Sequence, residues 1–325
     1  MGMNPLPKSL IEAVRFFASP DNCREYLAAR RWPNGVTCPT CGSKAVYFDR
    51  SRNGWECKTR HPQRKFTLKT GTIFEDSPLG FDKWLPAVWM IANCKNGVSS
   101  WELHRAVGVT QKTAWFMLQR IRLAMQDEDT GGKLGGEVEV DETFIGGKAR
   151  NMSKHRKARK GISQHTSMAS KAAVMGLLER HPEKGKSKIR LQTLDNRKRD
   201  ALLGEVRTHV EQGATVNTDS LKSYFGLADE GYIHNVIDHA EKYVDGTVHT
   251  NGCENFWCLL KRALKGTYVA VEPFHLFRYL DEEAFRFNYR TWNDAERFDA
   301  VVGSVVGRRL TYKELIAALS AGAPA

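Results

Sequence analysis

The sequence predicts a multidomain protein in which a metal-binding segment and a helical segment precede an α/β domain. Three observations support this fold class. A cluster of cysteines and a histidine lies near the N-terminus, apolar residues at helical spacing fill residues 81–128, and strand-like alternation begins at Glu137. The chain has 325 residues, which is long for one compact core, so we expect two or three domains.

The composition is that of a folded protein, with 41% hydrophobic and 26% charged residues. The sequence contains no run of 18 apolar residues and no secretory leader, so we expect a cytoplasmic protein without a membrane partner. Lys and Arg total 49 against 37 Asp and Glu, a formal net charge of +12. This surplus favours a polyanionic partner, although charge alone does not separate nucleic-acid binding from an ordinary basic surface.

The first region, residues 1–80, is predicted to contain a helical lead over residues 10–30 and then a metal site. Cys38, Cys41, Cys57 and His61 follow the pattern C-x2-C-x15-C-x3-H. Zn²⁺ binds four such ligands in a tetrahedron, and the long gap has room for a β-hairpin. Gly42 supplies the permissive backbone that the turn after the second cysteine needs.

We expect this zinc to be structural, because a site with four protein ligands has no open coordination position for a substrate. The alternative is a set of ordinary buried thiols beside a surface histidine. Basic residues around the cluster either contact phosphate or form a solvated face; they are Arg50, Arg52, Lys58, Arg60, Arg64 and Lys65.

Residues 81–130 are predicted to hold a helix-turn-helix. Trp101, Leu103 and Val107 form one apolar stripe, Gly108 ends that helix, and Thr110 caps the next. The second helix should bury Ala114, Met117, Leu118, Ile121 and Met125. Its other face presents side chains able to reach DNA from a major groove, namely Gln111, Lys112, Thr113, Gln119 and Arg120. A plain helical hairpin is the alternative.

A glycine-rich joint separates this region from a predicted domain over residues 137–298, which a helical tail follows over 299–325. Strands are expected at residues 137–145, 172–178, 188–194, 214–218 and 234–236, and helices at 199–212, 254–265 and 273–289. Three strands, a helix, a strand, a helix and a further strand, then helices, is the order of an RNase H-like fold, an inference by analogy.

A basic loop lies between the first two of these strands. Residues 148–171 contain eight Lys and Arg and no acidic residue, so the loop should not fold alone and should order on DNA. The loop leaves the strand that carries Asp141. Four of its side chains are predicted phosphate contacts: Arg156, Lys157, Arg159 and Lys160. The alternative is a solvated insertion.

Three acidic residues fall where divalent cations can be held. Asp141 lies within the first strand, Asp219 follows the fourth, and Glu254 opens a helix on which Trp257 and Lys261 share its face. Carboxylates from separate elements can hold two ions, the arrangement that phosphoryl transfer uses, and hard oxygen ligands suit Mg²⁺ or Mn²⁺. Any single one of the 37 acidic residues is equally well explained as a surface charge or a helix cap.

At these residues the chain resembles bacterial insertion-sequence transposases of the ISXO type. The resemblance covers nearly the whole chain, and the motifs occur in the family's order. They are residues 31–42 (RWPNGVTCPTCG), 71–77 (GTIFEDS), 108–115 (GVTQKTAW), 140–143 (VDET), 218–219 (TD), 249–251 (HTN) with Glu254, Trp257 with 261–262 (KR), 286–288 (RFN) and 307–312 (GRRLTY).

The resemblance implies that Asp141, Asp219 and Glu254 form a DDE triad for two Mg²⁺ or Mn²⁺ ions, with Lys261 as a basic companion that contacts DNA. Trp257 is predicted to contact DNA as well. His61 stands where the family often has a second CxxC. The implied partners are double-stranded DNA, both at the element's terminal inverted repeats and at the target, and further copies of the chain in a dimer or larger assembly at the bacterial nucleoid. The implied reaction is 3′-end cleavage and strand transfer.

Two other functions remain open. One is a DNA-binding regulator or catalytically dead descendant, although all three carboxylates and Lys261 are present. The other is an RNase H-like nuclease such as a junction resolvase, which would not need the N-terminal region to recognise a defined end sequence. Joined products, rather than cleavage alone, distinguish a transposase from both.

Overall fold

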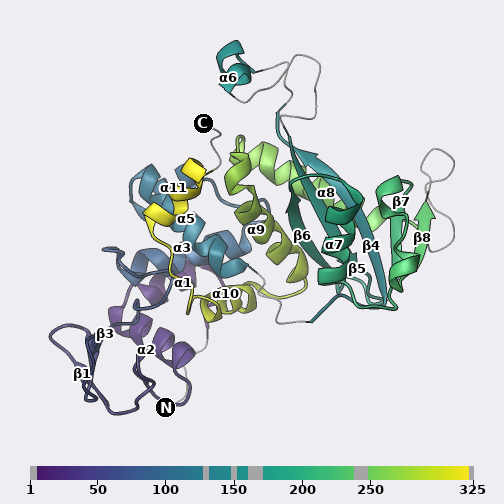
Figure 1. Cartoon of the computed structure of the whole chain (residues 1–325). Coiled ribbons are helices and arrows are strands. Elements are labelled where there is room, and N and C mark those ends of the chain that lie inside the picture. Colours follow the sequence, from purple (N-terminus) through teal and green to yellow (C-terminus); the bar gives the residue numbers. More distant parts are fainter. Residues whose placement is uncertain (1–5, 127–131, 148–151, 160–170, 238–247, 322–325) are drawn as a thin grey trace. The chain divides into compact units, whose positions relative to one another are not determined.

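A computed structural model describes residues 6–126, 132–147, 152–159, 171–237 and 248–321 (Figure 1). The chain divides into two compact units. Residues 127–291 form one unit, and residues 1–126 together with 292–325 form the other. No helix in the described ranges is long and apolar enough to cross a membrane.

The unit of residues 127–291 is built on a five-stranded mixed sheet (Figure 1). Its strands are β4 (Glu137–Ile145), β5 (Ala172–Glu179), β6 (Lys188–Leu194), β7 (Thr215–Asp219) and β8 (Ile233–Ile237), in the order β6-β5-β4-β7-β8. β4, β5 and β6 pair antiparallel, whereas β7 pairs parallel to β4 and β8 parallel to β7. This is the sheet of the RNase H-like fold, as predicted.

Helices cover both faces of the sheet. α7 (Arg199–His209) packs on one face, where Val138 and Val140 of β4 join its core. α8 (Asn251–Ala263) and α9 (Leu276–Asn288) share the second core with Val174 and Leu178 of β5. Because side chains alternate along a strand, Glu139 and Asp141 point to the face that α8 covers. Contacts of both residues with α8 confirm this orientation.

Two segments of this unit differ from the sequence prediction. The helix expected between β7 and β8 is replaced by two 3₁₀ turns, Lys222–Tyr224 and Ala228–Glu230. The basic loop, predicted to have no structure of its own, contains a short helix, α6 (Lys154–Arg159). Lys, Arg and Ala all have high helix propensity, so these residues can form a helical turn without an apolar face. Lys160 and the side chains of Arg156 and Arg159 lie outside the described residues.

The other unit begins with two helices where the sequence predicted one helical lead over residues 10–30. α1 (Leu10–Phe17) ends before Ser19, and α2 (Pro20–Arg31) begins at a proline in its first turn. The Ser19 side chain accepts a hydrogen bond from the Asn22 amide, so it caps α2. Proline suits a first helical position and interrupts a continuing helix, which explains the division.

A small antiparallel sheet follows α2. It consists of β1 (Val46–Asp49), β2 (Gly54–Cys57) and β3 (Lys65–Phe66), in that order. Trp55 of β2 and Phe66 of β3 stack with ring centroids 6.1 Å apart, and Trp32 meets Trp55 edge-on. These rings form most of a core that is too small to be stable on burial alone.

The predicted helix-turn-helix is present after α3 (Phe81–Asn93). α4 (Ser100–Val107) ends at Gly108, which has a left-handed backbone with φ of 63°. α5 (Gln111–Met125) is capped by the Thr110 side chain. All five residues predicted to be buried in α5 are buried. Trp101, placed in the apolar stripe of the first helix, is instead 59% exposed.

The C-terminal segment packs into the N-terminal helices of the same unit. α10 (Asp294–Gly303) contributes Phe298, whose ring contacts Phe17, Tyr26 and Trp89. The Tyr26 hydroxyl donates a hydrogen bond to Asp299. α11 (Tyr312–Ala321) follows in the same unit. The boundary expected after residue 298 therefore differs from the structure, in which residues 292–325 belong with residues 1–126.

Gln119 and Arg120 do not lie on an exposed face of α5, and their prediction as DNA contacts is wrong. Gln119 is fully buried and Arg120 is 4% exposed. The Arg120 guanidinium donates hydrogen bonds to the carbonyl oxygens of Ile73, Glu75 and Leu310. It therefore links three segments of this unit, and burial lowers the pKa of the guanidinium.

We predict that Arg120→Ala destabilises the protein without a specific effect on DNA. The substitution leaves three buried carbonyl oxygens without their charged donor, so the free energy of unfolding should fall by about 3 kcal/mol. Urea denaturation of the full chain measures this change. The control is the exposed neighbour Lys112→Ala, which should change stability by no more than about 0.5 kcal/mol. A loss below about 1 kcal/mol for Arg120→Ala would contradict the structural role.

Candidate metal centre and active site

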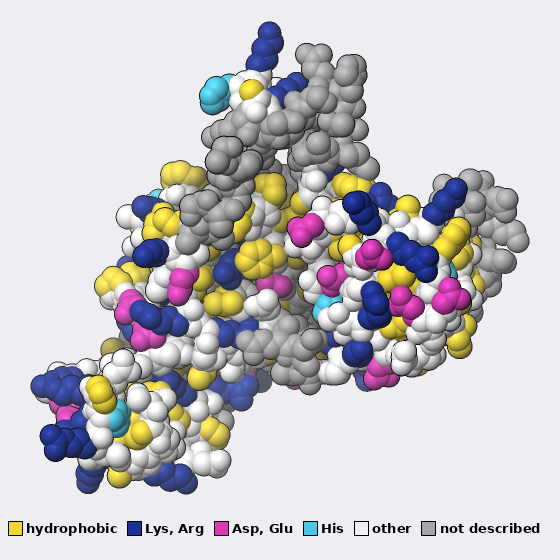
Figure 2. All heavy atoms as spheres, viewed as in Figure 1, with side chains coloured by type: hydrophobic (Ala, Val, Ile, Leu, Met, Phe, Trp, Pro, Cys, Tyr) yellow, Lys and Arg dark blue, Asp and Glu magenta, His cyan; other side chains and the backbone are white. Residues whose placement is uncertain are grey.

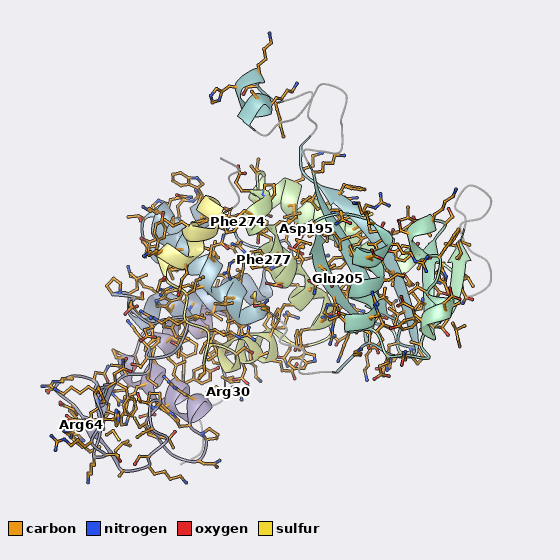
Figure 3. All side chains as sticks on the ribbon, viewed as in Figure 1. Arg30, Arg64, Asp195, Glu205, Phe274 and Phe277 are labelled. Carbon is orange, nitrogen blue, oxygen red and sulfur yellow. The ribbon has the colours of Figure 1, made fainter. Side chains whose placement is uncertain are left out.

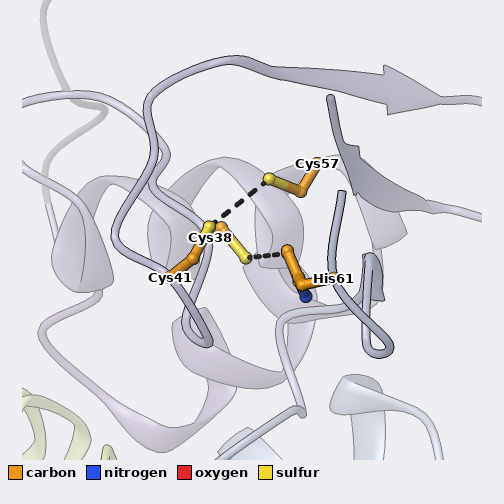
Figure 4. Close-up of side chains that lie close together, drawn as sticks. All are labelled: Cys38, Cys41, Cys57 and His61. Carbon is orange, nitrogen blue, oxygen red and sulfur yellow. Dashed lines mark hydrogen bonds between the residues drawn. The ribbon is translucent and has the colours of Figure 1, made fainter. Parts of the chain in front are cut away.

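The four predicted zinc ligands come together in the small sheet and its preceding turn (Figure 4). Cys38 and Cys41 occupy a tight turn in which the Gly42 amide donates to the Cys38 carbonyl, and Gly42 has a φ of 71° that favours glycine. Cys57 ends β2, so β1 and β2 form the hairpin predicted for the gap between the cysteines. His61 completes the cluster.

The geometry of this cluster fits a zinc ion. All four ligand atoms lie within 4.8 Å of one another. The Cys41 and Cys57 sulfurs are 3.6 Å apart, and the Cys38 sulfur is 3.4 Å from His61 Nε2. Zn–S bonds of about 2.3 Å in a tetrahedron place neighbouring sulfurs about 3.8 Å apart, close to this spacing.

Local hydrogen bonds also favour the thiolate form that binds zinc. Burial opposes ionisation of Cys57, but hydrogen bonds from His61 and Thr59 outweigh it and lower the pKa of Cys57 to about 6. His61, the least typical member of the motif, is thus a ligand candidate by position as well as by residue type.

Exposed basic side chains gather over this zinc-ribbon region, at the lower left of Figure 2. The exposed members are Arg50, Arg52, Lys58, Arg60 and Lys65. Arg64 differs from them in being less exposed (Figure 3); it pairs with Glu56 at 3.0 Å and donates to the Cys57 carbonyl, whereas Arg52 is exposed but lies 3.7 Å from Asp49. The structure therefore leaves five of the six predicted basic residues in positions that can meet phosphate.

The three predicted catalytic carboxylates occupy one end of the large sheet and the adjoining helix. Asp141 is in β4, and Asp219 is the last residue of β7. In the parallel β4–β7 pair Val140 lies opposite Thr218, so the two aspartates follow side by side. Glu254 is exposed in the first turn of α8.

These carboxylates influence one another electrostatically. Burial raises the pKa of Asp141, and the negative charges of Asp219 and Glu254 raise it further. The Trp257 indole N–H, 2.8 Å from Asp141 Oδ2, acts in the opposite direction. Within the described residues the zinc cluster is the one set of three or more possible ligands drawn together within 4.8 Å, so the carboxylates converge less tightly.

Asp141 differs from the other acidic residues of β4 in having no cationic partner. Glu139 pairs with Arg180 at 2.6 Å and Glu142 with Arg197 at 2.9 Å. In the part of the chain that the structure describes, neither Asp141 nor Asp219 makes an ion pair with Lys, Arg or His. A buried carboxylate without a cation is costly, so this pair of aspartates suits a divalent ion.

The predicted DNA contact at Trp257 is wrong, because this side chain is only 5% exposed. Seven residues span about two helical turns, so Glu254 and Lys261 do share a face, and both are exposed. Trp257 lies off that face and turns toward the sheet, as its bond to Asp141 shows.

Two networks that sequence reasoning missed support this site. Glu139, 1% exposed, accepts hydrogen bonds from Arg180 and from the Cys253 amide in the first turn of α8. Arg180 also donates to the His249 carbonyl. The alternation of EVEVD could have indicated Glu139, since it places this residue on the same face of β4 as Asp141.

The second network holds the segment after β7. Glu142 accepts hydrogen bonds from Arg197 and from the Tyr224 hydroxyl. The Ser223 hydroxyl donates to the Arg197 carbonyl at 3.0 Å, and the Leu221 amide donates to Asp219 Oδ1 at 3.1 Å. The segment that follows Asp219 is thereby tied to β4. Arg197 and Tyr224 carried no recognisable motif in the sequence.

Comparison with known proteins places this architecture among transposases. A family model for the ISXO2-like transposase domain matches residues 133–288, and one for the transposase zinc-ribbon domain matches residues 18–59. An uncharacterized protein in transposable element ISH50 of Halobacterium salinarum is 30% identical over 270 residues, covering 77% of this chain and 85% of that protein.

A solved structure was also matched, the simian T-cell lymphotropic virus intasome in complex with PP2A regulatory subunit B56 gamma. It has 10% identity and a TM-score of 0.28, over 59% of this chain and 66% of that chain.

The RNase H-like sheet, its carboxylates and the zinc ribbon together define a DDE-type transposase. The chain belongs to the family that combines a transposase zinc ribbon with an ISXO2-like transposase domain.

We predict about one tightly bound zinc ion per chain, held by the three cysteines and His61. Metal analysis of purified protein measures it. His61→Ala should lose most of this zinc, and chelation should unfold the ribbon, because the ribbon's own core is small. Cys258→Ser, which changes an exposed cysteine outside the cluster, should keep the full zinc content. Full zinc in the His61→Ala protein would remove His61 from the site.

Proposed function

We propose that this transposase recognises the terminal inverted repeats of its own insertion sequence, cleaves their 3′ ends and joins them to target DNA. The observation that carries the proposal is the pairing of Asp141 with Asp219 at the β4–β7 junction. Both lack an ion-pair partner among the described residues, whereas the neighbouring glutamates of β4 are neutralised by arginines. The third carboxylate, Glu254, comes from a helix that packs on the same face.

Asp141, Asp219 and Glu254 would hold Mg²⁺ or Mn²⁺, since carboxylate oxygens are the ligands that these hard cations prefer. Two such ions, when bound, activate the attacking hydroxyl or water and stabilise the leaving oxygen of an in-line displacement. The protein's own contribution is to hold the carboxylates on rigid elements. Lys261, exposed two helical turns beyond Glu254, would contact a phosphate of the DNA.

DNA recognition would come from the helix-turn-helix, the zinc ribbon and the basic loop. On α5, Lys112 is exposed, whereas Gln111 donates to the Ser100 hydroxyl and the Thr113 hydroxyl bonds to that of Thr110. Gln111 and Thr113 are therefore engaged within the motif. Lys112, whose ammonium lies 4.9 Å from the centre of the Tyr312 ring, is the exposed side chain of the three and would be the one to meet DNA. Lys157 and its basic neighbours in α6 would add contacts to the phosphate backbone.

A catalytically inactive regulator remains the second candidate. No observation favours it, because all three carboxylates are present and two networks hold the start of α8 and the segment after Asp219, which end binding alone would not require. A resolvase-like nuclease is disfavoured by the zinc ribbon and helix-turn-helix. A dimer or larger assembly on DNA is part of the proposal, and the mass of the end-bound complex tests it.

We predict that Asp219→Asn abolishes strand transfer while leaving end binding intact. Mutation of a residue that only hydrogen-bonds a metal ligand typically lowers metal affinity or activity by about 10- to 100-fold. Loss of a direct ligand should therefore leave less than about one-hundredth of the wild-type rate of strand transfer. The assay joins a radiolabelled end, taken from the repeats that flank the gene, to plasmid DNA with Mn²⁺. Asp229→Asn, which changes an exposed aspartate of the second 3₁₀ turn, is the matched control. Unimpaired joining by Asp219→Asn would exclude it from the triad.

We predict that Lys112→Ala weakens binding equally on the element's end and on random DNA. Loss of one phosphate contact should reduce the log–log dependence of affinity on salt by about 0.9. Fluorescence anisotropy at several salt concentrations measures both quantities. Lys184→Ala removes an equal charge from the exposed β5–β6 turn and should leave the slope unchanged. A loss confined to the cognate end would instead make Lys112 a base-reading residue.

A further inference from the structure

The Trp257 indole forms a direct link between α8 and the carboxylate of Asp141. Its Nε1 lies 2.8 Å from Asp141 Oδ2. An indole N–H can only donate, so the carboxylate oxygen accepts. The ring is 5% exposed and belongs to the core shared by α8, α9 and β5. The donor is therefore held by packing on the helix that also carries Glu254.

Gly176 provides the space for this ring. It is the cross-strand partner of Asp141 in the β4–β5 pair. A Cβ at residue 176 would lie 2.7 Å and 2.8 Å from two carbons of the Trp257 ring, closer than real Cβ contacts. The backbone of β5 thus approaches the indole directly, and any larger side chain there would displace it.

The start of α8 is also fixed to β4, at Glu139, two residues before Asp141. Glu139 Oε2 accepts the Cys253 amide at 3.0 Å, and its other oxygen takes the Arg180 ion pair at 2.6 Å. Glu139 and Asp141 are successive inward residues of β4, so they contact α8 at Cys253 and at Trp257, about one turn apart. The helix has little freedom to slide or rotate on the strand.

We propose that Trp257 is a positioning residue that orients the Asp141 carboxylate for its divalent cation. The indole fixes which carboxylate oxygen faces α8 and leaves the other oxygen for the cation. Glu254 lies one turn before Trp257, so the same contact sets the separation of two triad members. This inference rests on the proposed function, because it assumes that Asp141 binds a metal.

The test separates the hydrogen bond from the packing of the ring. Trp257→Phe keeps an aromatic ring and removes the donor. Gly176→Ala keeps the donor and displaces the ring. If both act through the bond to Asp141, the double variant should bind Mn²⁺ no worse than Trp257→Phe alone, because the smaller ring makes room for the added methyl group.

The readout is equilibrium binding of Mn²⁺ to the zinc-loaded full chain. The electron paramagnetic resonance signal of free Mn²⁺ measures how much remains unbound. Strand transfer against Mn²⁺ concentration is the second measurement. Each single variant should raise the dissociation constant and the half-saturating Mn²⁺ concentration by about 10-fold or more. Trp84→Phe is the matched control, because Trp84 is also buried and its indole also donates a hydrogen bond, to Ser77, in the other unit.

Wild-type Mn²⁺ affinity in folded Trp257→Phe would overturn the positioning role, as would independent, additive effects of the two substitutions. Thermal unfolding and zinc content establish that each variant is folded, and Gly176→Ala provides the test if Trp257→Phe is not. Failure of the proposed function looks different. In that case the Mn²⁺ site of the wild-type protein survives Asp219→Asn, and both proposals fall together.

Discussion

The parallel pairing of β4 with β7 is the constraint on which the active site depends. It places Asp141 and Asp219 side by side at one point of the sheet, and the alternation of β4 turns Asp141 toward α8. Two carboxylates at such a junction repel each other, and burial adds to the cost of the Asp141 charge. A bound cation would offset both costs, and within the described residues no side chain forms an ion pair with either aspartate.

The glutamates that flank Asp141 in β4 have partners within the unit, which makes Asp141 an informative exception. Glu139 has Arg180 and a helix amide, and Glu142 has Arg197 and Tyr224. Breaking a buried ion pair lowers the free energy of unfolding by far more than the intact pair contributes to it, because one charge is left buried without a partner. Both networks therefore keep their elements in one arrangement. One network holds the start of α8 and the other the segment after Asp219, the two parts that bring the remaining carboxylates to Asp141.

Much of this could be predicted from local sequence. The bounds of β4 and β6, the zinc ligands and the caps at Gly108 and Thr110 each follow from a period or from turn chemistry within a few residues. Arg120 could not be placed in this way, because its partners Ile73 and Leu310 lie 47 and 190 positions away. Trp257 was misplaced for a similar reason. Helical spacing groups Trp257 with Glu254 on α8. The position of the ring is instead set by the space that Gly176 leaves on β5.

The path of the chain limits how the unit that contains the zinc ribbon and the helix-turn-helix can fold. Residues 127–291 are inserted into the other unit, whose core needs Phe298 from α10 against Phe17, Tyr26 and Trp89. Without residues 292–325, these aromatic surfaces and the Arg120 guanidinium would lose their C-terminal partners. A fragment ending at residue 126 would therefore lack part of its core, and this unit can be completed only after the RNase H-like unit has been synthesised. The helix-turn-helix thus acquires its final packing only in a chain that already carries Asp141, Asp219 and Glu254.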